Sequence, residues 1–267
     1  MLKRGLRHLA RGYLTLREFA LPRPRRFVWI LSHMRAGSSL LHHLLISHPS
    51  FLGCGERNAA YRMPRDLDRS AVDMYYRRRQ LWTRSPGFVD QINHTRFVPD
   101  RSVLQDSRLQ VIFLLRRPDH AIASMADVLG RHYGMTGTQA AEYYLERVPA
   151  LAADAESLDD PERAFGLTYE DLIDNTAAAL EDLSHFLGLA QPLTDHYRTF
   201  TFTGKSGDPS PRIQAGRIVA SEPRRLPPLD SALWEEAETV YLEARSRLWR
   251  CCQSPARPLN LGPENNE

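Results

Sequence analysis

Two groups of residues near the start of the chain could do chemistry, and the first is a run suited to binding an anion. It combines a cation, a glycine and two hydroxyl side chains: Arg35, Ala36, Gly37, Ser38, Ser39 and Leu40. Small residues allow backbone N–H groups to turn inward around an anion. The pattern therefore predicts a phosphate or sulfate site.

The second group could accept a proton. Glu56 follows Gly55 shortly after the anion-binding run, and His94 ends a polar cluster that begins at Asp90. A carboxylate or an imidazole within hydrogen-bond reach of a hydroxyl can act as its general base. Both residues are candidates for this role.

A further arginine and serine suggest a second phosphate contact. Arg116 follows the apolar run at 109–115, and Ser124 comes eight residues later. An arginine at a strand end can donate two parallel hydrogen bonds to a phosphate, and a serine on the next helix can add its hydroxyl.

The elements that position these groups follow from the apolar pattern. The run Phe27–Leu31 predicts a buried strand, and leucines at helical spacing follow the two serines. A helix beginning at such a turn directs unpaired N–H groups and its dipole at an anion. Further strands are predicted at 51–54, 88–94, 109–115 and 164–168, and they alternate with helices. We therefore expect an α/β fold, a three-layer α/β/α domain with a mainly parallel central sheet.

Composition limits the classes of function. The 267 residues carry a net charge of +3, with arginines concentrated at 1–35 and 57–131. This favours an anionic ligand over nucleic acid, for which a more basic domain is expected. Cys54, Cys251 and Cys252 fit neither a disulfide framework nor a metal site, so we interpret them as thiols in a reducing compartment. No apolar run approaches the roughly 18 residues of a membrane span or forms a signal peptide, which predicts a cytoplasmic location.

The chain divides into three parts. Residues 1–26 are predicted to form a basic amphipathic helix and a linker, 27–250 the main domain, and 251–267 a tail. Residues 57–105 are predicted to be an insertion or lid that shapes the acceptor site, with a helix running through Tyr75 to Trp82. The N-terminal helix places Leu2, Leu6, Leu9, Tyr13 and Leu16 on one face. That face either packs on the domain or rests on an anionic membrane surface.

Four stretches, in order, resemble sulfotransferases that use 3′-phosphoadenosine 5′-phosphosulfate (PAPS). Residues 35–39 resemble the 5′-phosphosulfate loop, although Met34 and Ala36 depart from its pattern. Arg116 and Ser124 resemble the 3′-phosphate site, and the segment LTYEDLI contains Tyr169, which in this family lies against the nucleotide. The loop at 204–209, with Lys205, resembles a late loop that covers the donor. The similarity spans most of 27–220 and implies a P-loop-like sulfotransferase fold.

The resemblance implies transfer of a sulfuryl group from PAPS to an acceptor hydroxyl without a metal. Arg35 would bridge the leaving phosphate and the sulfonate, with Lys205 assisting. Glu56 would be the base, or His94 as in cytosolic members; a one-residue uncertainty in alignment could place Arg57 at the position of Glu56. Arginines at 57–105 suggest a glycan or another small hydroxylated molecule as acceptor. The sequence does not predict the oligomeric state.

Two other functions remain open. A P-loop kinase-like phosphotransferase would need the Gly-x-x-x-x-Gly-Lys-Ser/Thr pattern and a carboxylate for Mg²⁺ at a strand end, and neither is evident. A non-catalytic nucleotide- or anion-binding protein would use the same cradle without a base.

Overall fold

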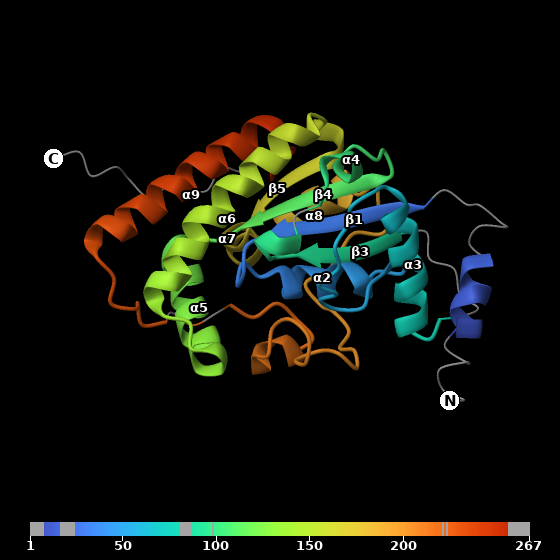
Figure 1. Cartoon of the computed structure of the whole chain (residues 1–267), viewed down its shortest axis with the longest axis horizontal. Helices are drawn as coiled ribbons and strands as arrows, with labels where there is room; N and C mark the ends of the chain where they lie inside the picture. Colours follow the sequence, from blue (N-terminus) through green and yellow to red (C-terminus); the bar gives the residue numbers. More distant parts are fainter. Residues whose placement is uncertain are drawn as a thin grey trace.

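The computed structural model describes residues 8–16, 25–80, 87–97, 99–220, 222 and 224–255. Strands and helices alternate along the chain, as the apolar pattern predicts (Figure 1). The strands are β1 (Arg26–Ser32), β2 (Phe51–Leu52), β3 (Gly87–Ile92), β4 (Leu109–Leu115) and β5 (Ala164–Thr168). The helices are α2 (Ser38–Ser47), α3 (Arg65–Arg77), α4 (Arg101–Leu104), α5 (Pro118–Tyr133), α6 (Gly137–Leu158), α7 (Tyr169–Asp174), α8 (Thr176–Phe186) and α9 (Ser231–Cys251).

The five strands form one parallel sheet in the order β2-β3-β1-β4-β5. Its central strands are buried on both faces, which explains why their sequences are continuous apolar runs. All the strands run the same way, so their carboxyl ends meet at one edge. That edge brings together the residues that follow β1, β3 and β4.

Helices cover both faces of the sheet. One face packs against α3, α5, α6 and α9, and the opposite face packs against α2, α7 and α8. In Figure 1, α6 and α9 lie side by side on the face opposite α2. Each layer buries its own hydrophobic cluster against the sheet. The predicted three-layer α/β/α fold is confirmed.

The stretch at 57–105 is more closely integrated than an insertion or lid. It supplies α3, which buries Leu67, Met74 and Tyr75 in the core, and β3, which pairs with β1 inside the sheet. The predicted helix through Trp82 ends at Arg77, and Trp82 lies outside the described residues. Any role in the acceptor site therefore belongs to the loops of this stretch.

The N-terminal helix packs through a different face from the predicted one. Residues 8–16 are helical, but Leu9 and Leu16 are 74% and 70% exposed, whereas Leu14 is buried in the core. Arg11, three residues before Leu14, pairs with Asp73 on α3 at 2.6 Å and fixes this face inward. Membrane contact stays a prediction. Among the described residues, none of the helices is both long and apolar enough to cross a membrane.

The three cysteines are free thiols in the structure, as predicted. Cys54 and Cys252 are buried, and burial raises the pKa of the Cys54 thiol to about 12. A buried thiol with a raised pKa is unreactive. None of the three cysteines lines the cavity described below.

Candidate active site

The turn between β1 and α2 forms a cradle with two residues in the left-handed backbone region. Arg35 has φ of 63° and Gly37 has φ of 97°, both in the left-handed region. A Cβ added at Gly37 would lie 2.5 Å from the ring of Tyr169, so glycine is required by close approach as well as by φ. Within the described residues, no side chain caps the N-terminus of α2. Its first N–H groups are therefore available to an anion.

The Arg35 side chain is held between two elements far away in the sequence. Its Nε donates to Ser124 Oγ on α5 at 3.1 Å, and its Nη2 pairs with Asp208 Oδ1 at 3.0 Å. Burial acts to raise the pKa of Asp208, but the charge of Arg35 and hydrogen bonds from Ser210 outweigh it and hold the pKa below its usual value. Arg35 is therefore fixed at the cradle, with a carboxylate as its partner.

Arg116 lies beside the same turn and is fixed by its backbone and its side chain. Its guanidinium stacks over the Tyr169 ring at 4.1 Å and donates to the carbonyl oxygen of Arg35 at 3.0 Å. Its backbone N–H donates to His33 Nε2 at 3.0 Å. Because Nε2 accepts, Nδ1 carries the ring proton and donates to the Met34 carbonyl at 2.9 Å. His33 thus ties the strand end of Arg116 to the cradle.

Burial keeps His33 neutral. The imidazole is fully buried, and desolvation lowers its pKa to about 3. A neutral imidazole can accept from one strand end and donate to the other, whereas a charged one would only donate. His33 therefore serves as a bridge rather than as an acid or base.

The late loop at 203–210 lies directly against the cradle. The Asp208 N–H donates to Ser39 Oγ at 3.1 Å, and a Cβ added at Gly207 would lie 2.4 Å from that oxygen. One turn further along α2, the buried His43 ring bonds to Thr203 Oγ1 at 2.8 Å. The loop is therefore anchored at two points on α2. Lys205 is exposed and lines the pocket at its edge.

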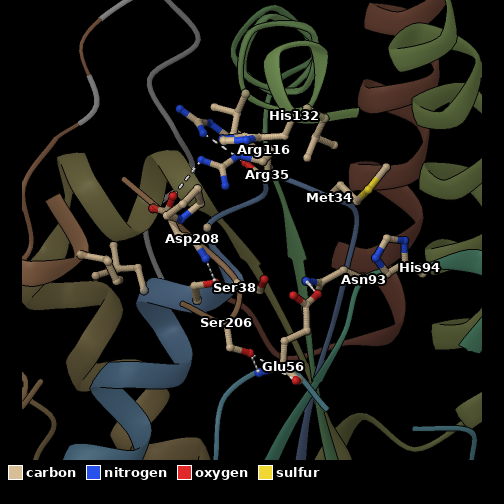
Figure 2. Close-up of a pocket in the computed structure, with 18 of the residues that line it drawn as sticks. Met34, Arg35, Ser38, Glu56, Asn93, His94, Arg116, His132, Ser206 and Asp208 are labelled. Atoms are coloured by element: carbon tan, nitrogen blue, oxygen red, sulfur yellow. Dashed lines mark hydrogen bonds and ion pairs between the residues drawn. The ribbon is translucent and has the colours of Figure 1, made fainter. Parts of the chain in front are cut away.

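One cavity of about 830 Å³ joins the cradle to the candidate bases. Figure 2 shows Arg35, Arg116 and Asp208 at one end and Glu56, Asn93 and His94 at the other. Glu56 Oε1 accepts a hydrogen bond from Asn93 Nδ2 at 3.0 Å. Burial lowers the pKa of His94, while the charge of Glu56 acts in the opposite direction.

Arg57 does not occupy the position of Glu56. It turns away from the cavity, where its Nη1 donates to Asp90 Oδ2 at 2.9 Å and to the Tyr61 hydroxyl at 2.8 Å. Burial opposes the charge on Arg57, but Asp90 and Tyr61 more than compensate and raise its pKa. Because Arg57 is held in the interior, its neighbour Glu56 faces the cavity. This geometry favours Glu56 over Arg57 as the residue at the cavity, and its role as the base stays a prediction.

The arginines of 57–105 do not gather at the cavity as expected. Arg62, Arg65 and Arg69 are exposed near the start of α3, and Arg57 is buried. Among the described arginines of this stretch, Arg96 is the one that lines the cavity. Most of the arginines that suggested the acceptor therefore lie away from the cavity, and the nature of the acceptor stays a prediction.

Most of the predicted site residues line this cavity: Arg35, Gly37, Ser38, Ser39, Leu40, Glu56, His94, Arg116, Tyr169 and Lys205. Two do not. The Ala36 side chain is fully buried in the cluster beneath α2, and Ser124 lies behind Arg35, to which it is bonded. Only the backbone of Ala36 could serve an anion in the cradle.

Sequence reasoning missed four residues that line or brace the site: His33, Asn93, Asp208 and Arg212. Asn93 lies in the polar cluster that ends the predicted strand at 88–94. That cluster is the sequence feature that could have indicated a role for Asn93 in the site. Asp208 stands next to Gly207, whose close approach to Ser39 depends on tertiary structure. Among the described residues, no group of three or more His, Cys, Asp or Glu side chains could hold a metal ion.

Comparison with known proteins agrees with this architecture. A model described as "Sulfotransferase family" matches residues 108–195, which run from β4 to α8 and contain Arg116 and Tyr169. The sulfotransferase domain of the Synechococcus PCC 7002 olefin synthase has a TM-score of 0.51 at 20% identity. That alignment covers 81% of this chain and 94% of the domain. No curated protein sequence matches the chain.

Two further solved structures are similar in part. Mouse sulfotransferase SULT7A1, complexed with PAP, has a TM-score of 0.44 at 12% identity over 68% of this chain, and the alignment covers 63% of the mouse chain's length. Retinol dehydratase, in a complex with retinol and PAP, has a TM-score of 0.38 at 13% identity, and the alignment covers 90% of this chain and 85% of the other. The segment from β4 to α8 is thus similar to the sulfotransferase family, and the fold is similar to that of the olefin synthase domain.

Proposed function

We propose that the protein transfers the sulfuryl group of PAPS to an acceptor hydroxyl. The observation that supports this most is the convergence of Arg35, Arg116 and the open N-terminus of α2 on the cavity that also holds Glu56. A donor with phosphates at two positions needs two separate anion contacts, and a transfer reaction needs a base opposite them. A simple anion-binding protein would need no base there.

The residues present fit this donor. The 5′-phosphosulfate would lie in the cradle, against the α2 N–H groups, Ser38 and Arg35, because these groups supply hydrogen bonds and positive charge together. The 3′-phosphate would bind Arg116, with Ser124 as the further predicted contact. The ring of Tyr169, stacked on Arg116, would lie against the nucleotide.

The reaction requires the protein to position the donor and the acceptor, to stabilise the charge on the leaving oxygen and to remove the acceptor proton. The acceptor oxygen forms a bond to sulfur as the bond from sulfur to the 5′-phosphate oxygen breaks, and the products are a sulfate ester and adenosine 3′,5′-bisphosphate (PAP). The acceptor proton passes to the carboxylate of Glu56. Arg35 holds the charge that develops on the leaving oxygen, where a fixed donor is most effective. Lys205, which lines the same cavity, would assist.

The mixed apolar and polar lining of the cavity supports a small hydroxylated molecule as the acceptor. Met34, Val128, Leu129 and Met135 line the cavity together with His94 and Arg96. Apolar walls with a few polar groups are typical of small-molecule sites. A cytoplasmic location and the absence of nucleic-acid binding remain part of the proposal.

The assignment of the base is tested by Glu56→Gln, which keeps the shape of the side chain and removes its basicity. We expect PAP binding to be unchanged and turnover to fall about 10²-fold or more, because a general base contributes about 10²–10⁴-fold. Turnover is measured as PAP released from PAPS, with water or a simple phenol as acceptor.

His94→Ala is the comparison variant. It should reduce turnover less than Glu56→Gln if Glu56 is the base. Near-normal turnover by Glu56→Gln together with an inactive His94→Ala enzyme would assign the base to His94 instead.

A further inference from the structure

The amide of Asn93 is fixed in one orientation between two partners. The Ser32 hydroxyl, at the end of β1, donates to Asn93 Oδ1 at 2.8 Å, and Asn93 Nδ2 donates to Glu56 Oε1 at 3.0 Å. An amide oxygen can only accept and an amide NH₂ can only donate. Because a carboxylate can only accept, the NH₂ group faces Glu56, and Oδ1 is left to accept from the Ser32 hydroxyl. The Asn93 side chain is buried, so this orientation is not set by solvent.

Two side chains on α6 hold the strand ends that carry this amide. The Tyr143 hydroxyl donates to the carbonyl of Asn93 and accepts the N–H of Met34. One turn later, Arg147 donates through Nε to the carbonyl of Ser32 at 3.1 Å. Arg147 is fully buried, and its second contact, to the carbonyl of Ile92 at 3.5 Å, joins β3 to β1. The helix thus sets the spacing between Ser32 and Asn93.

The Glu56 backbone is held separately. Its N–H donates to Ser206 Oγ at 3.1 Å, and the same hydroxyl donates to its carbonyl at 3.3 Å. On the other side, the Arg57–Asp90 pair fixes the next residue. With the backbone fixed on both sides, the remaining freedom of Glu56 lies in its side-chain torsions. The hydrogen bond from Asn93 to Oε1 restricts these torsions.

We infer that Asn93 is a positioning residue that orients the Glu56 carboxylate toward the acceptor hydroxyl, with Ser32 holding the amide oxygen and α6 setting the strand ends. With Asn93 bound to Oε1, Oε2 is the oxygen left to take the proton. A base held in one orientation removes a proton without first having to be ordered. The inference rests on the proposed role of Glu56 as the base.

The test is a double-mutant cycle between Asn93→Ala and Glu56→Gln. Asn93→Ala alone should lower kcat about tenfold or more while leaving KM for PAPS and PAP binding unchanged. In the Glu56→Gln background it should have little further effect, because the group that it orients no longer acts as a base. A structural defect would instead lower activity in both backgrounds.

Asn93→Asp sharpens the test and covers the case in which Asn93→Ala fails to fold. It keeps the shape and the acceptor for Ser32 but replaces the donor facing Glu56 with an oxygen. We expect kcat to fall at least as far as in Asn93→Ala. Ser32→Ala frees the amide and should give a smaller fall in kcat. Thermal unfolding and PAP calorimetry on each variant verify the fold.

The possible outcomes separate the inference from the function on which it rests. Near-normal kcat for Asn93→Ala and Asn93→Asp, with an impaired Glu56→Gln, would overturn the positioning role and keep the base. Full additivity in the cycle would also overturn it. Normal turnover by Glu56→Gln would remove the base assignment, and with it this role of Asn93.

Discussion

The two ends of the cavity are built in different ways. At the donor end, Arg35, Gly37 and the start of α2 follow one another in the chain, and backbone geometry alone forms the cradle. At the acceptor end, Glu56 is oriented by Asn93 and Ser206, which lie 37 and 150 residues away. The backbone of the cradle is therefore local in the sequence, whereas the Arg35 side chain and the acceptor end are held by residues far away in the chain.

The two ends also differ in charge. The donor end combines Arg35, Arg116, Lys205 and Arg212 with the carboxylate of Asp208, whereas the acceptor end combines Glu56 with His94 and Arg96. A cluster of cations is suited to binding a highly charged donor, and a carboxylate near an imidazole is suited to removing a proton. We therefore expect affinity for the donor to depend mainly on the donor end, and proton removal to depend mainly on the acceptor end.

The largest expected effect separates the two arginines of the donor end. Arg35→Ala should mainly lower kcat, by about 10²-fold or more, because the oxygen that it contacts gains charge only as the sulfonate leaves. Arg116→Ala should mainly weaken PAP binding, by about tenfold or more, because the 3′-phosphate has the same charge throughout the reaction. Steady-state kinetics and PAP calorimetry measure both. If each variant raised KM alone, this division between the arginines would be wrong.

A smaller effect is expected from Asp208→Asn. The Asp208 carboxylate, 3.0 Å from Arg35 Nη2, competes with an anionic donor for the same guanidinium. Removing this charge while keeping the side-chain shape should tighten PAP binding about fivefold at low salt, corresponding to about 1 kcal/mol for a partly exposed pair. The gain should shrink at high salt. Weaker binding by the variant would show that Asp208 orients Arg35 instead.

These differences explain what the sequence could predict. The cradle was predictable because Arg35, Gly37 and Ser38 are adjacent and an apolar strand precedes them. The bounds of β4 and β5 also agree with the predicted runs, because a strand buried on both faces is apolar throughout. Both features depend on residues close together in the sequence.

The acceptor end could not be predicted in the same detail. Glu56 and Arg57 are neighbours, and the sequence does not show which of them faces the cavity. Arg57 turns away from it because it pairs with Asp90, a buried residue 33 positions further along the chain. Likewise, the exposed arginines of α3 and the buried Leu14 reflect which helix face meets the sheet. Such choices depend on tertiary contacts that periodicity does not contain.

The most direct measurement is calorimetry of the full chain with PAP, AMP and ATP–Mg²⁺. The account predicts that PAP binds without magnesium and that AMP, which lacks the 3′-phosphate, binds at least about tenfold more weakly, because a charge-assisted hydrogen bond contributes about 1.5–3 kcal/mol. Arg116→Ala should abolish this preference. Tight binding of ATP–Mg²⁺ with equal affinity for PAP and AMP would contradict the proposed donor and indicate a kinase-like phosphotransferase.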